Sequence, residues 1–381
     1  MNIKLLNKID DVGLKIFSDA YNVGEDVMNE DGILVRSANL LETEFDENLK
    51  AIARAGAGVN NIPIDECAKK GIVVFNTPGA NANAVKELTL CGLLLTSRKI
   101  IQGYEWAKTV KDNYAKNIEK GKSAFAGHEL YKKKLGVIGL GAIGANVANA
   151  ALDFGMEVYG YDPYISIQGA WNLNHLVKHV TKLEDLYREV DYLTIHIPSL
   201  ESTKGFLNKD AFKQMKDGVK VLNFARGDLI NENDMIDAVK EGKVGSYITD
   251  FGSEKLCELE NVICLPHLGA STAESEENCA IMAVHEMIDY LENGNITNSV
   301  NMPNIAEGWN TKVRVCIIHK NVPNMLAQFA TEIGKDHINI ENMYNKAKGD
   351  YAYTIIDTND PVEEEIFKNI SEVIKVRILQ K

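Results

Sequence analysis

The chain has no apolar run that approaches the roughly twenty residues of a membrane span. Its first ten residues, MNIKLLNKID, contain neither a long apolar core nor a small-residue cleavage site, so no secretory signal is visible. Basic residues are also in the minority, because 54 acidic side chains outnumber 41 basic ones and leave a net charge of −13. Nucleic acid and anionic membranes are therefore poor partners, and we expect a cytoplasmic globular protein.

Cysteine is sparse, and its six positions form no C-x-x-C pair and have no histidine at zinc-finger spacing. We therefore expect no metal site, and reduced, mostly buried thiols at Cys67, Cys91, Cys257, Cys264, Cys279 and Cys316. The chain also lacks repeats and low-complexity segments. One stretch, residues 108–134, is rich in lysine and has two interpretations: a solvated helix and loop, or a segment whose lysines reach an anionic substrate.

The most informative segment is LGVIGLGAIG, residues 135–144, in which a short apolar run leads into Gly139, Gly141 and Gly144 at G-x-G-x-x-G spacing. In a dinucleotide-binding fold the first two glycines let the backbone approach a pyrophosphate, and the third lets the helix pack against its strand. The next predicted strand, residues 156–161, ends in Asp162. A carboxylate there accepts the hydroxyls of an adenosine ribose and repels a 2′-phosphate, which favours NAD over NADP. The alternative is a chance glycine-rich turn.

At 381 residues the chain is expected to form two or three domains. Helical stretches separate further predicted strands at residues 32–35, 71–75, 192–197, 220–224, 245–249 and 261–265. This alternation predicts an α/β fold with parallel sheets, whose ligands lie at the carboxyl ends of the strands. Helices predicted at 84–97 and 273–290 connect one domain to the next.

The pattern changes after a stretch that is broken by Pro303, Gly308 and Trp309, and we interpret residues 301–311 as a linker. The remaining residues predict strands at 313–318, 338–344, 351–357 and 374–379, with helices at 323–333 and 362–370. This βαββαβ order is typical of a small ferredoxin-like module.

Six motifs occur in a fixed order: RAGAGVNN at 54–61, the glycine motif, HIP at 196–198, NFARG at 223–227, YITD at 247–250 and PHLGAST at 266–272. Together they resemble the D-isomer-specific 2-hydroxyacid dehydrogenases, and the tail resembles the ACT regulatory domain found in that family. The resemblance covers essentially the whole chain. It implies a flavodoxin-like substrate domain (residues 1–82, completed by 272–300), a Rossmann-type, doubly wound NAD-binding domain (83–271) and an ACT-like domain (312–381).

Oxidation of a 2-hydroxy acid needs a base for the hydroxyl proton, a cation for the carboxylate and a nicotinamide that faces the substrate carbon. His267 follows a predicted strand and is the base candidate, because imidazole titrates near neutral pH. Arg226, also at a strand end, offers a planar fork for the carboxylate. The alternatives are a surface ion-pair arginine and a hydrogen-bonded loop histidine.

Many family members place a glutamate five positions after the aspartate that is matched here by Asp250, and this glutamate stabilises the imidazolium. Position 255 is lysine in this chain, and the segment from Asp250 to His267 looks shortened. We therefore assign the role to Glu254, the nearest acid.

The resemblance also implies residues that bind cofactor and substrate. For NAD they are Gly139, Gly141, Ala142, Ile143, Gly144, Asp162, His196, Ile197, Pro198, Phe224, Ala225, Arg226, Asp250, His267 and Gly269. His196 is expected to have a structural role beside the adenine. For the substrate they are Arg36, Ser37, Gly58, Val59 and Asn81. Arg36 and Ser37 would face a phosphate, and Lys122 of the same or a neighbouring subunit is a further candidate.

In the tail, His319, Asn321 and Asn339 match the serine-binding residues of ACT domains, which implies L-serine as an effector. The family's glycine after the proline is Asn324 here, and asparagine tolerates the left-handed backbone conformation.

The implied activity is NAD-dependent oxidation of 3-phospho-D-glycerate to 3-phosphohydroxypyruvate, the first committed step of L-serine biosynthesis, by a homo-oligomer (dimer or tetramer). Two alternatives stay open: a dehydrogenase of another small D-2-hydroxy acid, and a non-catalytic NAD-sensing interaction protein. A requirement for a phosphate on the substrate would distinguish the implied activity from the first alternative. An absorbance assay for NADH would distinguish an enzyme from the second, non-catalytic alternative.

Overall fold

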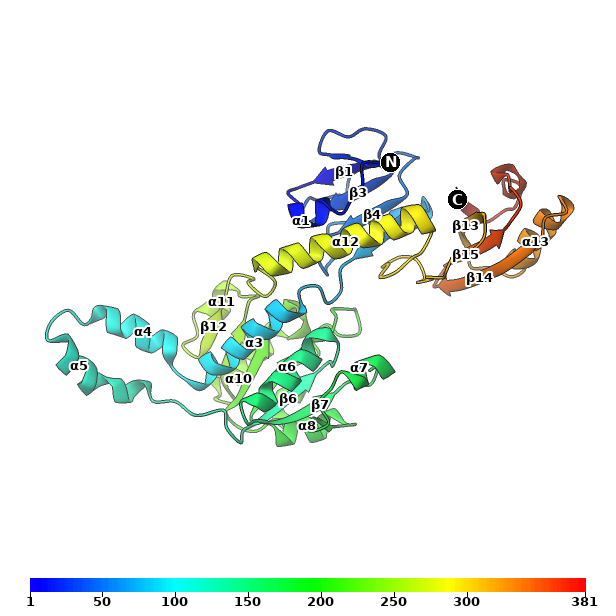
Figure 1. The fold of residues 1–381 in the computed structure, drawn as a ribbon. Coiled ribbons are helices and arrows are strands. Elements are labelled where there is room, and N and C mark those ends of the chain that lie inside the picture. The colour runs from blue at the N-terminus through cyan, green and yellow to red at the C-terminus, as the bar shows by residue number, and fades with distance from the viewer. The chain divides into compact units, whose positions relative to one another are not determined.

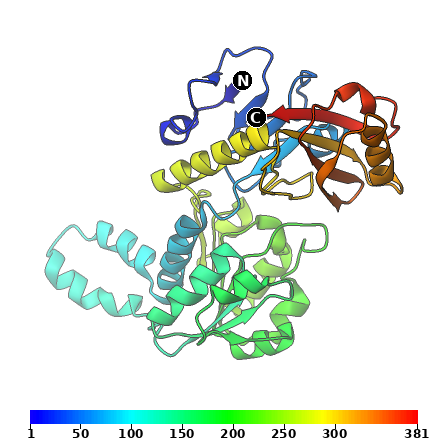
Figure 2. The same cartoon turned by 45° about the vertical axis from the view of Figure 1, so that its right-hand side comes forward.

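The computed structural model describes residues 1–381, the side chain of Gln168 excepted. The chain forms two compact units, which we describe separately: unit 1 comprises residues 1–81 and 273–381, and unit 2 comprises residues 82–272. Figures 1 and 2 show the elements of each unit. None of the helices in the described part of the chain is long and apolar enough to cross a membrane.

Unit 2 is built on a seven-stranded parallel sheet in the order β12-β11-β10-β9-β6-β7-β8. Its strands are β6 (Lys134–Ile138), β7 (Glu157–Tyr161), β8 (Lys178–His179), β9 (Tyr192–Ile195), β10 (Val219–Asn223), β11 (Val244–Thr249) and β12 (Val262–Cys264). Its helices are α3 (Ala82–Ser97), α4 (Ile100–Thr109), α5 (Tyr114–Gly121), η1 (Lys122–Phe125), α6 (Ala142–Asp153), α7 (Ile167–Trp171), α8 (Leu183–Glu189), α9 (Lys209–Gln214), η2 (Gly227–Leu229), α10 (Glu232–Lys240) and α11 (Glu254–Cys257).

The sheet of unit 2 is covered on both faces, as the apolar strand sequences predict. In β6, Leu135 and Val137 pack with Val147 of α6, whereas Ile138 packs into a separate core with Phe212 of α9. The strand order reverses direction beside β6, which is the doubly wound arrangement of dinucleotide-binding folds. The predicted fold class is confirmed. In Figure 1, α4 and α5 extend away from this sheet.

The first part of unit 1 is a five-stranded parallel sheet in the flavodoxin-like order β2-β1-β3-β4-β5. Its strands are β1 (Asn2–Leu6), β2 (Asn22–Gly24), β3 (Gly32–Val35), β4 (Ala51–Arg54) and β5 (Val73–Asn76), and its short helices are α1 (Asp11–Leu14) and α2 (Ile64–Lys69). The long helix α12 (Ala273–Asn293) packs on β3, β4 and β5 (Figure 1). Its buried face repeats at helical spacing through Ala280, Ala283, Val284, Met287 and Leu291.

The tail of unit 1 is a four-stranded antiparallel sheet in the order β14-β15-β13-β16. Its elements are β13 (Val313–Lys320), α13 (Met325–Lys335), β14 (Ile340–Lys348), β15 (Tyr351–Thr358), η3 (Glu364–Phe367) and β16 (Val373–Gln380). This strand order is that of the predicted ferredoxin-like module. Asn324, at the N-terminus of α13, adopts the expected left-handed conformation with φ 72°.

The prediction of a second tail helix over residues 362–370 is wrong, because only the 3-10 turn η3 forms there. The residues that anchor this segment in the module core are Val362, Phe367 and Ile370. The five-residue step from Val362 to Phe367 does not match the 3.6-residue repeat of an α-helix. The left-handed Glu372, with φ 76°, then turns the chain into β16.

The tail sheet and the N-terminal sheet share one hydrophobic core. Ile318 of β13 and Ile355 of β15 belong to the same buried cluster as Phe75 of β5 and Met287 of α12. Residues 301–311, interpreted above as a linker, have no helix or strand of their own but are anchored. The Asn301 side chain accepts a hydrogen bond from the Val74 N–H at 2.9 Å and donates to the Ile72 carbonyl at 2.8 Å.

Tail side chains also cap the C-terminal end of α12, which Figure 2 shows beside the tail sheet. Arg377 donates to the carbonyls of Tyr290 and Leu291 at 3.1 and 2.8 Å. Arg314 donates to the Asn293 carbonyl at 2.9 Å, and the Tyr353 hydroxyl donates to the Gly294 carbonyl at 2.7 Å. The last carbonyls of a helix have no intrahelical donors, and cations are favourable at that end, so the tail stabilises α12.

Candidate active site

The glycine motif forms a turn between β6 and α6 in unit 2. Gly139 has a φ of 86°, which only glycine adopts without strain, and Gly141 is the N-cap of α6. A Cβ added at Gly144 would overlap the carbonyl oxygen of Gly139, whereas one added at Gly141 would meet nothing within 4 Å. The backbone therefore packs tightly behind the loop and leaves open space in front of the helix N-terminus, as a pyrophosphate requires.

Asp162 follows β7 and turns its carboxylate toward the same loop. Its Oδ2 accepts the Leu140 N–H at 2.8 Å, and its Oδ1 accepts the Tyr164 N–H at 2.9 Å. His196 follows β9, and its Nε2 lies 3.0 Å from the Thr194 hydroxyl. Burial lowers the pKa of His196 to about 4, so the ring is neutral at physiological pH. A neutral, half-buried ring with a buried Nδ1 fits the structural role predicted for this residue better than proton transfer.

Other predicted cofactor residues lie at the same carboxyl edge of the sheet. Two of them begin α6, two follow His196, and two follow β10: Ala142, Ile143, Ile197, Pro198, Phe224 and Ala225.

Three neighbouring strands of unit 2 lead directly to the ionisable side chains that are best suited to catalysis. Arg226 follows β10, Asp250 follows β11, and His267 follows β12, and these strands pair as β10–β11 and β11–β12. The His267 N–H donates to the Asp250 carbonyl at 3.1 Å, and its exposed ring lies 4.7 Å from the Phe251 ring. His267 has a φ of 47°, so its backbone is in the left-handed region.

Asp250 is 3% exposed and connects the other two groups electrostatically. Burial raises the pKa of its carboxyl group, while the Gly269 N–H and the positive charges of His267 and Arg226 lower it. Its Oδ2 accepts the Gly269 N–H at 2.8 Å, whereas its Oδ1 is buried without a protein hydrogen-bond partner. An acceptor in this state has capacity for a donor from a bound molecule.

Glu254 stands apart from this trio. It is the first residue of α11 and is exposed, and the capping side chain of that helix is Ser253. Asp250 is a carboxylate whose pKa His267 influences directly. The assignment of Glu254 as the partner of His267 stays a prediction.

The predicted substrate residues lie at the carboxyl edge of the first sheet of unit 1. Arg36 follows β3, and its Nη2 donates to Oε1 of Glu276 at 2.7 Å. Ser37 is exposed beside it, and Gly58 and Val59 are half-buried in the loop after β4. Asn81, the last residue before α3, has a buried Oδ1 without a protein partner. The other candidate, Lys122, is exposed at the start of η1 and forms an ion pair with Glu119.

Three asparagines, none of which was predicted as a site residue, hold these loops in shape. The Asn7 side chain accepts the N–H groups of Ser37 and Ala38 at 3.0 and 2.6 Å. Asn76 donates to the Ala57 carbonyl at 2.6 Å. The buried Asn223 accepts the Ala225 N–H at 3.1 Å and donates to the Arg226 carbonyl at 2.8 Å. All three stand at the ends of strands, which is the signal that could have identified them.

The three predicted effector residues lie at different depths in the tail module. His319 is 2% exposed, and its ring nitrogens lie 2.8 Å from the Lys320 carbonyl and 2.9 Å from the Thr354 hydroxyl. Burial lowers its pKa. Asn321 and Asn339 are exposed, and their side chains donate to the Gly349 carbonyl at 3.1 Å and to Glu341 at 3.0 Å.

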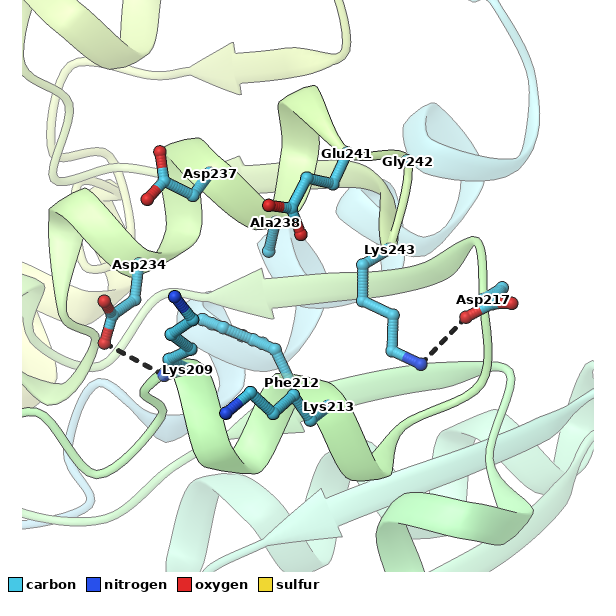
Figure 3. A pocket seen from close by; sticks show the side chains of 10 residues that line it. All are labelled: Lys209, Phe212, Lys213, Asp217, Asp234, Asp237, Ala238, Glu241, Gly242 and Lys243. Atoms are coloured by element: carbon cyan, nitrogen blue, oxygen red, sulfur yellow. Dashed lines mark hydrogen bonds and ion pairs between the residues drawn. The ribbon is translucent and has the colours of Figure 1, made fainter.

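A pocket of about 400 Å³ lies between α9 and α10 in unit 2, with Phe212 and charged side chains in its lining (Figure 3). Lys243 pairs there with Asp217 at 2.8 Å, and the Lys209 N–H donates to Asp234 at 2.9 Å. Asp217 and Lys243 precede β10 and β11, so the pocket belongs to the amino edge of the sheet, opposite Arg226 and Asp250. It is therefore not the candidate active site.

Among the described residues, no group of three or more His, Cys, Asp or Glu side chains could hold a metal ion. The features of unit 2 instead fit a dinucleotide: the tight glycine turn, the open helix N-terminus, Asp162 after the second strand and the free buried Oδ1 of Asp250. Fold and site together define a protein with a doubly wound dinucleotide-binding domain.

Comparison with known proteins specifies the family. Residues 90–269 match the family described as "D-isomer specific 2-hydroxyacid dehydrogenase, NAD binding domain". A hydroxypyruvate reductase of Thermotoga maritima is 38% identical over 273 residues, which cover 68% of this chain and 85% of that protein. The chain belongs to the D-isomer-specific 2-hydroxyacid dehydrogenase family, and unit 2 contains its NAD-binding domain.

Two further relatives carry a more specific name. A D-3-phosphoglycerate dehydrogenase of Methanocaldococcus jannaschii is 35% identical over 314 residues, which cover 80% of this chain and 58% of that protein. The crystal structure of the NAD⁺-bound 3-phosphoglycerate dehydrogenase of Entamoeba histolytica matches 79% of this chain and 98% of its own, with 28% identity and a TM-score of 0.61. This chain thus spans little more than half the length of the Methanocaldococcus protein.

Proposed function

We propose that the protein oxidises 3-phospho-D-glycerate to 3-phosphohydroxypyruvate with NAD, as the first committed step of L-serine biosynthesis. The observation that carries this proposal is the trio Arg226, Asp250 and His267 at the ends of three adjacent strands. The relatives named D-3-phosphoglycerate dehydrogenase support the choice of substrate.

Each member of the trio has a distinct task in the proposed reaction. His267 takes the proton of the substrate hydroxyl, and its exposed ring is accessible for this. The half-buried guanidinium of Arg226 binds the carboxylate through paired N–H groups. Asp250 stabilises the positive charge that His267 gains, and its buried Oδ1, which has no protein partner, would be available to accept a hydrogen bond from a bound cofactor. NAD, when bound, supplies the hydride acceptor.

A second candidate function is reduction of hydroxypyruvate, which the Thermotoga relative supports. The two functions differ in one group, the substrate phosphate. We therefore propose to compare the oxidation of NADH with 3-phosphohydroxypyruvate, hydroxypyruvate, pyruvate, glyoxylate and 2-oxoglutarate. Equal or faster turnover of hydroxypyruvate would replace the first function with the second, and no turnover of any 2-oxo acid would favour a non-catalytic NAD-sensing role.

Arg36 is the proposed phosphate ligand, and replacing it with alanine tests the substrate directly. A hydrogen bond to a charged group contributes about 1.5–3 kcal/mol, so Arg36→Ala is expected to lower kcat/KM for 3-phosphohydroxypyruvate by about 10- to 100-fold. Turnover of hydroxypyruvate should change little. The control is Glu276→Gln, which removes the ion-pair partner of Arg36 and keeps the cation. An equal loss with both substrates would indicate a folding role for Arg36.

Asp162 is the proposed determinant of cofactor choice. Two like unit charges 4 Å apart repel each other by about 1–4 kcal/mol near a protein surface. The Asp162 carboxylate should therefore repel the 2′-phosphate of NADPH, and NADH should bind at least about tenfold more tightly than NADPH. Asp162→Asn removes the charge and keeps an acceptor for the Leu140 or Tyr164 N–H, and it is expected to narrow that ratio. Titration with both cofactors measures the effect without any substrate. The exposed Asp185 provides the control variant Asp185→Asn, and an unchanged ratio in Asp162→Asn would remove Asp162 from the cofactor site.

We further propose a cytoplasmic homo-oligomer with a regulatory tail. Exposed apolar side chains on α4 and α5, among them Ile100, Tyr104 and Tyr114, support self-association. L-serine as an effector at Asn321 and Asn339 stays a prediction, supported by their exposure at the surface of the module.

A further inference from the structure

Two cysteines of unit 2 face each other beside Gly252. A Cβ built on Gly252 would lie 3.0 Å from Cys264 Sγ and 3.5 Å from Cys257 Sγ. The Cys257 thiol is also close enough to raise the pKa of the Cys264 thiol. Cys257 is the last residue of α11, and Cys264 is the last residue of β12. Neither has a part in the binding of cofactor or substrate described above.

The environments of the two thiols differ. Cys257 is exposed, whereas Cys264 is half-buried and packs against the core that contains Leu256 and Val262. Burial and the neighbouring Cys257 thiol raise the pKa of Cys264 to about 12. A dissolved reagent therefore reaches the exposed Cys257 first, and the half-buried Cys264 lies beside it as a second, less accessible thiol.

We propose that Cys257 and Cys264 form a reversible disulfide that switches the enzyme between an active dithiol state and a less active oxidised state. The oxidant is a small-molecule disulfide such as oxidised glutathione. The Cys257 thiolate attacks it, forms a mixed disulfide and releases one glutathione thiolate. Cys264 then loses its proton and attacks Cys257 Sγ, which forms the internal disulfide and releases the second glutathione. Two protein thiols are oxidised, and one disulfide is reduced to two thiols.

The effect on turnover, which rests on the proposed function, follows from where the two cysteines stand. Cys264 precedes His267 by three residues, and Cys257 shares the short helix α11 with Glu254. Two separate thiols must approach to an S–S distance of about 2.0 Å to become a disulfide, so α11 or the end of β12 has to move. A displacement of about 1 Å at a catalytic group can lower turnover by about 100-fold, and we expect oxidation to lower kcat/KM by about 10- to 100-fold.

The test uses the full chain, equilibrated with oxidised and reduced glutathione at graded ratios and then quenched with an alkylating reagent. Peptide mass spectrometry is expected to detect a Cys257–Cys264 disulfide in oxidising mixtures, and dithiothreitol should restore both free thiols and turnover. Cys257→Ser should retain full turnover after oxidation, and Cys264→Ala should accumulate a glutathione adduct at Cys257. Cys91→Ser removes another exposed thiol of unit 2 and should behave as the parent chain.

Several outcomes would overturn the proposal. A persistent glutathione adduct at Cys257 of the parent chain, with Cys264 still alkylated, would show that no dithiol exchange occurs. An internal disulfide without loss of turnover would disprove the switch. If the reduced chain turns over no 2-oxo acid, the proposed function fails, and NADH affinity in the two redox states would then decide whether oxidation alters the site.

Discussion

Replacing His267 with alanine is expected to lower kcat by about 10²–10⁴-fold, the usual contribution of a general acid or base. The imidazole is exposed at the end of β12, beside Arg226 and Asp250, and no other histidine follows the strands of this trio. NADH affinity should change little, because the glycine turn and Asp162 remain. Steady-state kinetics with 3-phosphohydroxypyruvate and a fluorescence titration with NADH measure the two quantities separately.

A second variant of His267 is needed because the backbone of this residue is in the left-handed region. Its φ of 47° is unfavourable for alanine, whereas asparagine adopts the left-handed region more readily. His267→Asn should therefore lose turnover to the same extent with less risk to the loop. The exposed His175 of unit 2 supplies the control His175→Ala. Turnover within tenfold of the parent in both His267 variants would exclude this residue as the base.

The same assay distinguishes Glu254 from Asp250 as the carboxylate partner of His267. If Glu254 is the partner of His267, Glu254→Gln should shift the pH profile of kcat/KM and lower its maximum. If Asp250 alone stabilises the imidazolium, the Glu254→Gln profile should match that of the parent chain.

Replacing Asp357 with alanine is expected to destabilise the protein by about 3–5 kcal/mol, the usual result of removing one partner of a buried ion pair. Arg314 and Asp357 are both fully buried, and their two hydrogen bonds measure 2.8 and 3.0 Å. Without the carboxylate, the Arg314 guanidinium stays buried with uncompensated charge. Denaturant unfolding of the full chain and hydrogen exchange in β13 and β15 would measure the loss.

Two control variants test whether the loss of stability in Asp357→Ala comes from the uncompensated buried charge. Lys335→Ala breaks an ion pair of 2.7 Å on the surface of α13 and should change stability little. The double variant Arg314→Met, Asp357→Leu removes both charges, but it also removes the donors that Arg314 supplies to the Asn293, Glu307 and Gly308 carbonyls, so it should recover only part of the loss. A loss below about 1 kcal/mol in Asp357→Ala would contradict the expectation.

The parts of the fold that depend on local sequence were predictable. Gly139, Gly141 and Gly144 indicate a phosphate-binding turn because their conformational requirements are set by neighbouring residues, and the structure has that turn between β6 and α6. The predicted strand at residues 32–35 has the same bounds as β3. Arg226, Asp250 and His267 could be placed together because each follows a strand of one parallel sheet.

Features that depend on distant contacts could not be predicted. β4, Ala51–Arg54, escaped detection because alanine has low β-propensity, and its burial between β3 and β5 is what makes it a strand. The cap on α12 joins Arg377 to the Tyr290 carbonyl across 87 positions. Nothing in the sequence near either residue indicates that contact. The helix predicted at 362–370 failed for a related reason, because burial of Phe367 determined its local conformation.

The cap that Arg314, Tyr353 and Arg377 place on α12 has a consequence for how this gene can change. Residues 301–311 look like a natural point for recombination, since they separate two recognisable folds in the sequence. If the tail were exchanged there, the last carbonyls of α12 would lose their donors, and the apolar surface that Ile318 and Ile355 cover would be exposed to water. In the detached tail, Ile318 and Ile355 would themselves be exposed. We therefore expect the tail and the end of α12 to be inherited together, and exchange of the tail alone to be disfavoured.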